Sequence, residues 1–392
     1  MRVLIVHNIL WAHYKSSVFQ ALQQLVDKQI NVDMKVLQIA RNERSRAGIE
    51  TTANTDGETT AAPAYQYNYE LLFDRFAEDI GVVERTRALL QRAKAYKPDV
   101  INLTGYYDPA QLMLLVWAKR RGIRVIIQNE STVADHERGG WKERLKRWIF
   151  SQCDGFFCFG SSSADYLIQL GVRPEQILLR KSAVDNNALL SAYQRALPTR
   201  LAQQKALGLC ANNFVFVGRL IDFKNLPSLI NAFAEARRQS IESAGWGLIM
   251  LGDGPQYDAL IRQVANLNLS DWVKILPGRP WFKVPDVLAL ANVLVLPSRS
   301  EPWGLVVNEA MACGMPVLVS NRCGCVQDLV HDGQNGLVFD PDQPAQLTRS
   351  LLRFMQNEVN AAQMGQLSQR IIAPYAPEMV AQEMLDGFKK IV

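Results

Sequence analysis

The sequence has no run of about 18 uncharged apolar residues, which is the length that a helix needs to cross a membrane. A secretory signal is not expected either, because the apolar run in Met1–His7 is too short and is typical of the start of a buried strand. Charge of one sign is also scarce. The net charge of +5 is compatible with anionic substrates or an anionic membrane surface but is too small to indicate nucleic acid. We therefore expect a cytoplasmic protein that does not bind nucleic acid.

Cysteine is scarce too, and its spacing does not indicate a metal site. The six cysteines stand at positions 153, 158, 210, 313, 323 and 325. Cys323 and Cys325 form a C-x-C pair, but no second pair has metal-like spacing and no histidine pair lies nearby. Several occur in apolar contexts typical of small core residues, and free thiols are typical of the reducing cytoplasm. We expect neither a metal ion nor a bound cofactor.

The stretch around residues 293–316 predicts a strand, a turn and a helix in that order. Val293–Pro297 is a short apolar run rich in β-branched residues that ends at its proline, and Gly304–Cys313 contains helix-forming residues with an apolar face. This order places the helix N-terminus at the carboxyl edge of a parallel sheet. The free N–H groups of Gly304, Leu305 and Val306 and the helix dipole would form a site for anionic oxygen there.

Two carboxylates flank this anion site, Glu301 in the turn and Glu309 about two helical turns further on. A carboxylate is a poor partner for phosphate but a good acceptor of hydrogen bonds from sugar hydroxyls. The stretch therefore indicates a ligand that carries both groups, such as a sugar nucleotide. The alternative is an ordinary surface turn and helix whose glutamates are solvated.

A second group of charged residues follows the predicted strand Phe214–Val217. Gly218 ends the strand, Arg219 can clamp phosphate oxygens with its planar guanidinium, and Lys224 adds a point charge before the helix that begins at Leu226. These two cations suit a leaving group whose negative charge grows as its bond breaks. The alternative is a pair of solvated cations beside a helix start.

Strand and helix patterns alternate along the chain with short connections, which predicts parallel doubly wound sheets whose ligands lie at the carboxyl ends of the strands. The length of 392 residues favours two or three domains. Three segments are less regular. We expect a long polar loop over residues 41–67, a helix over Leu71–Tyr96, and a polar, linker-like segment with helical pieces over Asn186–Cys210.

Two motifs together carry a family resemblance. Glu301 and Glu309 form E-x7-E inside P-S-x-x-E-P-W-G-L-V-x-x-E-A-M-A-C-G-M-P-V, and residues 218–225 match G-R-L-x-x-x-K-N. Both resemble the signatures of the retaining GT4 glycosyltransferases (glycosyl transferases group 1). The resemblance implies an α/β protein of the GT-B fold, in which two Rossmann-like doubly wound domains face each other across a deep cleft. It implies an acceptor-side domain over 1–183, a nucleotide-sugar-binding domain over 184–374, and a final helix over 375–392 that crosses back to the first domain.

The resemblance also implies a function. A retaining glycosyltransferase of this kind moves a sugar from a nucleotide diphosphate sugar, most often a UDP- or GDP-sugar, to a hydroxyl of a growing surface polysaccharide or lipid-linked oligosaccharide, without a metal. Arg219, Lys224 and the amides of residues 304–306 would stabilise the leaving group. Glu301 would contact the donor sugar and Glu309 the ribose. Asp340 and Asp342 form D-x-D in a late loop outside this site, and we do not expect them to bind a metal.

The family pattern assigns donor-site residues to the loops that follow the C-terminal strands, with the loop 278–280 against the nucleobase. They are Gly218, Arg219, Lys224, Gly252, Gly278, Arg279, Pro280, Ser298, Glu301, Gly304, Leu305, Val306 and Glu309. Relatives often carry a histidine after the strand equivalent to Val125–Ile127, and this chain has Glu130 there. Glu130 is therefore a candidate catalytic residue beside Glu301, Arg219 and Lys224, with His136 and His13 as further candidates.

The segment Trp141–Phe150 predicts a basic amphipathic helix. Trp141, Leu145, Trp148 and Ile149 share one face, and lysines and arginines lie elsewhere. One interpretation is contact with an anionic membrane that carries a lipid-linked acceptor, on the inner face of the cytoplasmic membrane. The favoured interpretation is that the apolar stripe packs against its own sheet, because any surface helix needs an apolar face.

Two other functions are compatible with the same motifs. One is a sugar-nucleotide phosphorylase or synthase of the GT-B fold. The other is a non-catalytic scaffold that binds a nucleotide sugar, although a binding module has no need for Arg219, Lys224, Glu301 and Glu309 together.

Overall fold

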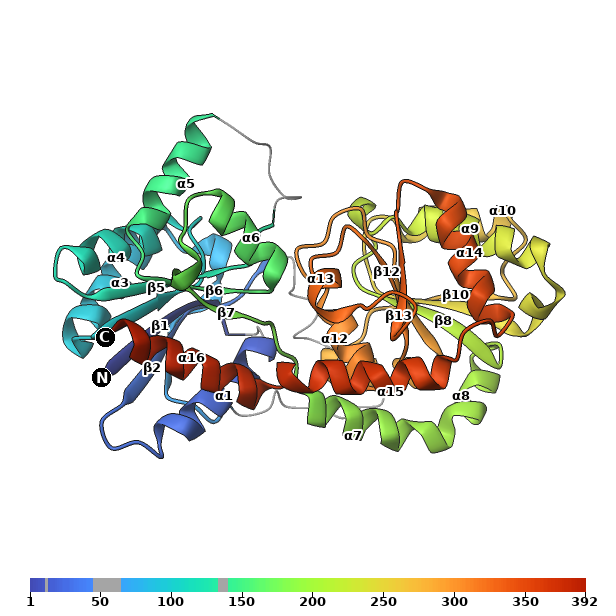
Figure 1. Cartoon of the computed structure of the whole chain (residues 1–392), viewed down its shortest axis with the longest axis horizontal. Helices are drawn as coiled ribbons and strands as arrows, with labels where there is room; N and C mark the ends of the chain where they lie inside the picture. Colours follow the sequence, from blue (N-terminus) through green and yellow to red (C-terminus); the bar gives the residue numbers. More distant parts are fainter. Residues whose placement is uncertain (11–12, 45–64, 133–139) are drawn as a thin grey trace. The chain divides into compact units, whose positions relative to one another are not determined.

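The computed structural model describes residues 1–10, 13–44, 65–132 and 140–392. The chain divides into two compact units (Figure 1). The first contains Met1–Val184 and Tyr375–Val392, and the second contains Asp185–Pro374. Each unit is a parallel sheet with helices packed on both faces. The predicted class, two doubly wound α/β units, is confirmed.

The described part of the first unit has a seven-stranded parallel sheet, sheet A, in the order β3-β2-β1-β4-β5-β6-β7. The strands are β1 Arg2–Ile9, β2 Asp33–Asn42, β3 Tyr69–Phe76, β4 Val100–Leu103, β5 Arg124–Asn129, β6 Gly155–Cys158 and β7 Ile177–Arg180. The order reverses between β1 and β4. This pair of strands is the topological switch point, where open α/β sheets bind ligands.

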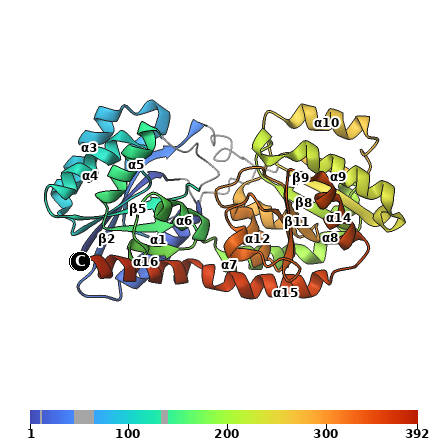
Figure 2. The same ribbon diagram turned by 45° about the horizontal axis from the view of Figure 1, so that its top comes forward.

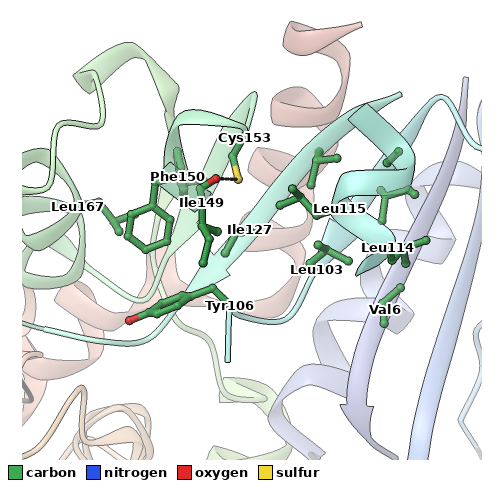
Figure 3. Close-up of a cluster of buried hydrophobic side chains, with 14 of the residues drawn as sticks. Val6, Leu103, Tyr106, Leu114, Leu115, Ile127, Ile149, Phe150, Cys153 and Leu167 are labelled. Carbon is green, nitrogen blue, oxygen red and sulfur yellow. Dashed lines mark hydrogen bonds between the residues drawn. The ribbon is translucent and has the colours of Figure 1, made fainter. Parts of the chain in front are cut away.

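Two apolar layers cover sheet A. The helices α1 (His13–Val26) and α16 (Pro377–Ile391) pack on one face, and side chains of both belong to one buried cluster that includes Phe19 and Phe388. Figure 2 shows α16 alongside α1. The other face is covered by α3 (Val82–Tyr96), α4 (Pro109–Lys119), α5 (Trp141–Ser151) and α6 (Ser161–Gln169). Figure 3 shows part of the cluster that these helices share with the sheet.

In the described residues of the second unit, sheet B has six parallel strands in the order β10-β9-β8-β11-β12-β13. The strands are β8 Asn212–Val217, β9 Trp246–Leu251, β10 Val273–Leu276, β11 Val293–Leu296, β12 Val317–Ser320 and β13 Gly336–Phe339. All side chains of β11 and β12 are buried, as expected for strands covered on both faces. The order of sheet B reverses between β8 and β11.

The helices of the second unit surround sheet B. They are α7 Asn186–Ala196, α8 Arg200–Ala206, α9 Leu226–Gln239, α10 Tyr257–Asn266, α11 Val284–Leu288, α12 Leu305–Ala312, α13 Val326–Leu329, α14 Pro344–Met355 and α15 Ala361–Ile372. The segment expected to be linker-like over Asn186–Cys210 consists largely of α7 and α8, and α7 packs against α11 and α12. The polar residues of this segment lie largely on the exposed faces of these helices. The polar composition therefore gives no sign of their buried faces.

The expected helix over Leu71–Tyr96 is wrong in its first part. Residues Tyr69–Phe76 form the edge strand β3, which pairs with β2, and the helix begins only at Val82. An edge strand is covered less completely than a central one, so the apolar residues of β3 do not alternate strictly and resemble a helical stripe. Of the polar loop expected over 41–67, residues 45–64 lie outside the described residues.

The apolar stripe of α5 does not pack against the sheet as favoured above. Trp141, Leu145 and Trp148 keep 70%, 44% and 52% of their surface exposed. Ile149 and Phe150, at the end of the helix, are the α5 side chains that enter the core, beside Tyr106 and Leu167 (Figure 3). These two residues anchor the helix, and the rest of its apolar face is left in solvent.

Candidate active site

The loops that follow β8 and β11 lie side by side, because these two strands pair at the switch point of sheet B. The β8 loop carries Gly218, Arg219 and Lys224, and the β11 loop carries Glu301 and leads into α12. The two segments with the strongest sequence motifs, about 80 residues apart in the chain, are therefore neighbours at the edge where ligands bind. This neighbourhood is the candidate site.

An ion pair joins the two loops. The ammonium group of Lys224 donates a hydrogen bond to Oε2 of Glu301, and these side chains keep only 17% and 16% of their surface exposed. Partial burial strengthens such a pair over a solvated one, because less water screens the charges. Both residues stand in the sequence motifs, but their contact does not follow from the sequence. The pair fixes the position of Glu301 and offsets part of the charge of Lys224.

Arg219 provides a cation that no carboxylate of the described residues neutralises. It directly follows Gly218 at the end of β8, and its side chain is exposed. Within the described residues, no hydrogen bond or ion pair engages its guanidinium group. Its planar fork of donors is therefore available to bind an anion at this edge.

The N-terminus of α12 adds uncharged donors. Gly304 caps the helix with a φ of +98°, a conformation that glycine adopts readily, and a Cβ there would lie 2.9 Å from Leu296 Cδ2. In the part of the chain that the structure describes, no acceptor takes a hydrogen bond from the backbone N–H of Gly304, Leu305 or Val306. These N–H groups and the helix dipole favour an anionic oxygen at this point.

Glu309 lies one and a half turns into α12 and is partly buried. No described side chain or backbone N–H donates a hydrogen bond to its carboxylate. Burial raises the pKa of Glu309 to about 7, because a desolvated carboxylate is less stable in its charged form. A carboxylate held in this way, without donors of its own, is suited to accept hydrogen bonds from the hydroxyls of a ligand.

Backbone hydrogen bonds from residues 323–325 support the turn that carries Glu301. The N–H of Gly324 donates to the carbonyl of Glu301 over 2.9 Å, and the N–H of Cys325 donates to that of Trp303 over 3.1 Å. A Cβ on Gly324 would overlap the carbonyl oxygen of Pro302. Sequence analysis treated C-G-C only as cysteines. The position of Gly324 directly after a strand, at the same edge of the sheet, is the feature of the sequence that points to this close contact.

The loops after β9 and β10 lie against the β8 loop. A Cβ on Gly252 would overlap the carbonyl oxygen of Gly218, so glycine lets the two loops touch. The N–H of Leu220 donates to the carbonyl of Asp253 over 2.9 Å, and the carboxylate of Asp253 accepts from the N–H of Gly278 over 3.1 Å. Asp253 thus ties the loop that carries Gly278 to this edge, a role that the sequence did not reveal.

Three predicted residues beside this group have different surroundings. Arg279 is exposed, Pro280 is buried, and Ser298 is fully buried at the end of β11. The side chain of Ser298 therefore lies beneath the turn that carries Glu301.

Glu130 lies in the first unit, exposed after β5 at the carboxyl edge of sheet A. His136 and the side chain of His13 lie outside the described residues. Asp340 and Asp342 lie near Arg322, with oxygens 3.9 and 3.1 Å from its guanidinium group.

The described ranges contain neither a cluster of metal ligands nor a membrane-spanning helix. No group of three or more histidine, cysteine, aspartate or glutamate side chains there is arranged to hold a metal ion. None of the helices in these ranges combines the length and apolar character that crossing a bilayer requires.

The raised pKa of Glu309 predicts a pH-dependent stability. The stability that the neutral carboxyl contributes is fully present below about pH 4.5 and is lost as the pH rises through about 7. Glu309→Gln has no carboxyl group to deprotonate at this position, so it does not lose this stability. Its free energy of unfolding minus that of the parent should therefore increase by about 1–3 kcal/mol between pH 5 and 8. Chemical unfolding at several pH values measures it, with Asp271→Asn as the control for an exposed carboxylate. A constant difference across this range would contradict the burial of Glu309.

The close approach at Gly324 predicts that Gly324→Ala lowers the free energy of unfolding by about 1–3 kcal/mol, since the added methyl group must push the Pro302 carbonyl away. Gly245→Ala is the matched control, because a Cβ there meets no atom within 4 Å. Thermal unfolding of both variants tests this close contact. Equal melting temperatures would show that the turn is not tightly packed against Gly324.

Two family models match the chain. The one described as Glycosyl transferases group 1 matches residues 200–371, and the one described as Glycosyltransferase Family 4 matches residues 45–186. Together they span most of the sequence, including all the motifs of the second unit.

Individual proteins agree with these matches. The exopolysaccharide phosphotransferase SCO2592 of Streptomyces coelicolor is 26% identical over 382 residues, which cover 96% of this chain and 37% of that protein. The D-inositol 3-phosphate glycosyltransferase of Frankia alni is 30% identical over 206 residues, 50% of this chain and 49% of that protein. The matched segments thus span half or less of these relatives. A crystal structure of Anabaena Alr3699/HepE in complex with UDP matches 99% of both chains with a TM-score of 0.74 and 17% identity. Residues 45–186 and 200–371 therefore match two glycosyltransferase families, and the chain has the GT-B fold.

Proposed function

We propose that this protein is a retaining glycosyltransferase that moves a sugar from a nucleotide diphosphate sugar to a hydroxyl group of an acceptor. The observation that carries the proposal is the joining of three features at the switch point of sheet B. They are the available guanidinium of Arg219, the Lys224–Glu301 ion pair and the unoccupied N–H donors of α12. The matches to these two families support the same reaction class.

The diphosphate of the donor binds the positive part of this site. Negative charge grows on the leaving phosphate as the bond to the sugar breaks, so donors placed in advance stabilise the transition state more than the ground state. Arg219 supplies a full charge, Lys224 supplies the part of its charge that Glu301 does not offset, and the α12 N–H groups supply partial charges. These groups take the part that a divalent cation plays in other sugar transferases.

The two glutamates accept hydrogen bonds from the hydroxyl groups of the donor. Glu301, held by Lys224 next to the α12 N-terminus, accepts hydrogen bonds from the transferred sugar. Glu309, which lies further along α12 without a donor of its own among the described residues, accepts from the ribose. A hydroxyl that donates to Glu309 stabilises its charged form and returns its pKa toward the ordinary value.

The proposed chemical step is a front-face substitution. The bond between the anomeric carbon and the phosphate oxygen breaks, and the acceptor oxygen forms a bond on the same face. The proton of the acceptor hydroxyl passes to an oxygen of the departing phosphate, so the reaction needs no base from the protein. Glu130 is proposed to contact the transferred sugar or the acceptor from the edge of sheet A.

We propose a UDP- or GDP-sugar as donor and a surface polysaccharide or lipid-linked oligosaccharide as acceptor. UDP is supported by the Anabaena structure, which contains it. A saccharide acceptor is supported by the name of the Streptomyces relative, an exopolysaccharide phosphotransferase.

The exposed face of α5 supports contact with an anionic membrane on the cytoplasmic side. Trp141, Leu145 and Trp148 present apolar surface to solvent, and Lys142, Arg144 and Arg147 on the same helix are exposed cations. Indole rings favour the interface between lipid head groups and acyl chains, and cations next to them attract anionic lipids. Such contact would bring the enzyme to a lipid-linked acceptor.

Removing the available guanidinium tests the proposed donor site. Arg219→Ala should lower turnover of the donor about a hundredfold or more, which corresponds to a few kcal/mol of transition-state stabilisation. The measurement is the rate of nucleotide diphosphate release from UDP- and GDP-sugars. Arg262→Ala, which removes an exposed arginine of α10 in the same unit, is the matched control.

Parent-like turnover by Arg219→Ala would rule out this role. The anomeric configuration of the product, measured by NMR, separates the proposed transferase from an inverting enzyme. Incubation of the donor with phosphate in place of an acceptor separates it from a phosphorylase. Donor binding by calorimetry without any turnover would indicate a binding scaffold.

Binding to vesicles tests the membrane contact. The parent protein should sediment with phosphatidylglycerol vesicles and much less with phosphatidylcholine vesicles, and high salt should weaken the binding. The double variant Trp141→Ser and Trp148→Ser should bind about tenfold more weakly or worse, because it loses apolar surface that enters the interface. Ile241→Ser, at an exposed apolar residue of the second unit, is the control. Unchanged binding by the double variant would exclude this face of α5.

A further inference from the structure

Tyr107 presents an aromatic ring to solvent at the carboxyl edge of sheet A. It belongs to the loop between β4 and α4, and β4 pairs with β1 where the order of the sheet reverses. Tyr107 keeps 62% of its surface exposed, whereas its neighbour Tyr106 keeps 5%. Open parallel sheets bind ligands at this edge, so the exposed ring stands where a ligand is expected.

The orientation of the Tyr107 ring is fixed by its neighbours. It packs on the ring of Tyr106, with 4.2 Å between the centroids and 32° between the planes. Its hydroxyl lies 2.8 Å from the hydroxyl of Tyr106 and 3.4 Å from Oγ of Ser131, which follows β5. Tyr106 in turn packs edge-on against Phe150, with 4.9 Å between the centroids (Figure 3). The exposed ring therefore rests on a buried aromatic layer.

The backbone that follows Tyr107 is fixed as well. Asp108 caps α4 by accepting a hydrogen bond from the N–H of Ala110 over 3.0 Å. Its carboxylate also lies 3.3 Å from the guanidinium group of Arg85, and both side chains are largely buried. Tyr107 is thus held between a buried aromatic residue and a helix cap. A ligand that contacts it does not have to order a loose side chain, which lowers the entropic cost of binding.

An exposed aromatic residue does not by itself indicate a ligand, because single apolar residues are common on protein surfaces. Tyr107 differs in being held in one orientation while most of its ring stays in water. Holding a side chain costs conformational entropy, and a ring that is mostly exposed recovers little of that cost by burial. The arrangement is therefore better suited to a ligand that covers the ring than to the stability of the free protein.

The chemistry of the ring suits the face of a sugar. A pyranose carries most of its hydroxyl groups at its rim and C–H groups on its faces. The face of an aromatic ring is electron-rich and attracts these C–H groups, while the contact also removes apolar surface from water. The ring of Tyr107 therefore offers a flat surface of the right kind for one pyranose.

Glu130 provides the second kind of group that a sugar requires. It directly precedes Ser131, which contacts the hydroxyl of Tyr107, and its side chain is exposed. A carboxylate accepts hydrogen bonds from the hydroxyl groups at the rim of a pyranose. An aromatic face and a carboxylate on neighbouring loops thus match the two kinds of surface that one sugar ring presents.

We propose that Tyr107 binds a pyranose ring of the acceptor against its exposed face, beside Glu130. The ligand class is a pyranose that has at least one face free of axial hydroxyl groups. This inference rests on the proposed function, since it places a saccharide acceptor at the carboxyl edge of sheet A. All the groups that it uses belong to the first unit.

Saturation-transfer difference NMR on the full chain tests this site without any turnover. The probes are the methyl glycosides of glucose, galactose and mannose. We expect at least one of them to bind, with the strongest transfer to protons on one face of its ring. Tyr107→Ala should weaken that binding about tenfold because it removes the aromatic surface. Tyr107→Phe keeps this surface and should retain most of the binding.

The matched control is Tyr69→Ala, at a tyrosine of the edge strand β3 that keeps 38% of its surface exposed. This variant should bind the glycosides as the parent does. The proposal is overturned if none of the three glycosides binds the parent protein, or if Tyr107→Ala binds them as tightly as the parent.

Thermal unfolding distinguishes binding from a structural role. Tyr107 is mostly exposed, and Tyr106 has its own contact with Oγ of Ser131 at 3.3 Å. Tyr107→Ala should therefore melt within a few degrees of the parent. A large drop in melting temperature with unchanged glycoside affinity would make Tyr107 a structural residue.

The proposal for Tyr107 and the proposed function can fail separately. When the glycoside that binds is used as the acceptor, Tyr107→Ala should raise its KM about tenfold and leave the affinity for UDP unchanged. The proposed function fails if no nucleotide sugar is turned over and UDP does not bind the parent protein. Glycoside binding is measured without any nucleotide, so its loss or persistence in Tyr107→Ala decides the Tyr107 site alone.

Discussion

The ion pair between Lys224 and Glu301 is the contact on which the account of this protein depends. It joins the loops after β8 and β11, two strands whose pairing creates the switch point of sheet B. A carboxylate so close to a phosphate site would repel the ligand if it were free, and Lys224 offsets that repulsion. In the proposed site, the pair leaves Arg219 and the α12 N–H groups to bind the anion, and Glu301 accepts hydrogen bonds from hydroxyl groups. Under the proposed function, this one contact lets the same small region bind both parts of a sugar nucleotide.

Close backbone approach keeps that pair in place. Gly252 lets the β9 loop touch the β8 loop, and Gly324 lets the segment after β12 support the turn of Glu301. Most of these contacts are made by backbone groups on parallel strand ends, whose positions the sheet fixes. The charged side chains therefore rest on a rigid edge, as electrostatic stabilisation of a transition state requires.

The sequence predicted the parts of this site whose chemistry is visible in single residues. Arg219, Lys224, Glu301 and Glu309 stand in dense motifs beside strong strand patterns, and the alternation of elements was enough for the fold class. It missed features that depend on tertiary contacts. The strand β3 resembles a helix in the sequence because the apolar residues of this edge strand do not alternate strictly. The stripe of α5 predicts a buried face, but Ile149 and Phe150 are the α5 side chains that enter the core.

A crystal structure of the full chain with a bound nucleoside diphosphate tests the central claim most directly. The account predicts phosphate oxygens about 3 Å from the guanidinium of Arg219 and from the N–H groups at the start of α12, with the ribose hydroxyls on Glu309. It also predicts that Lys224 keeps its contact with Glu301 or shares it with the phosphate. A nucleotide bound away from the carboxyl edge of sheet B, without contact to Arg219 or Glu309, would contradict it.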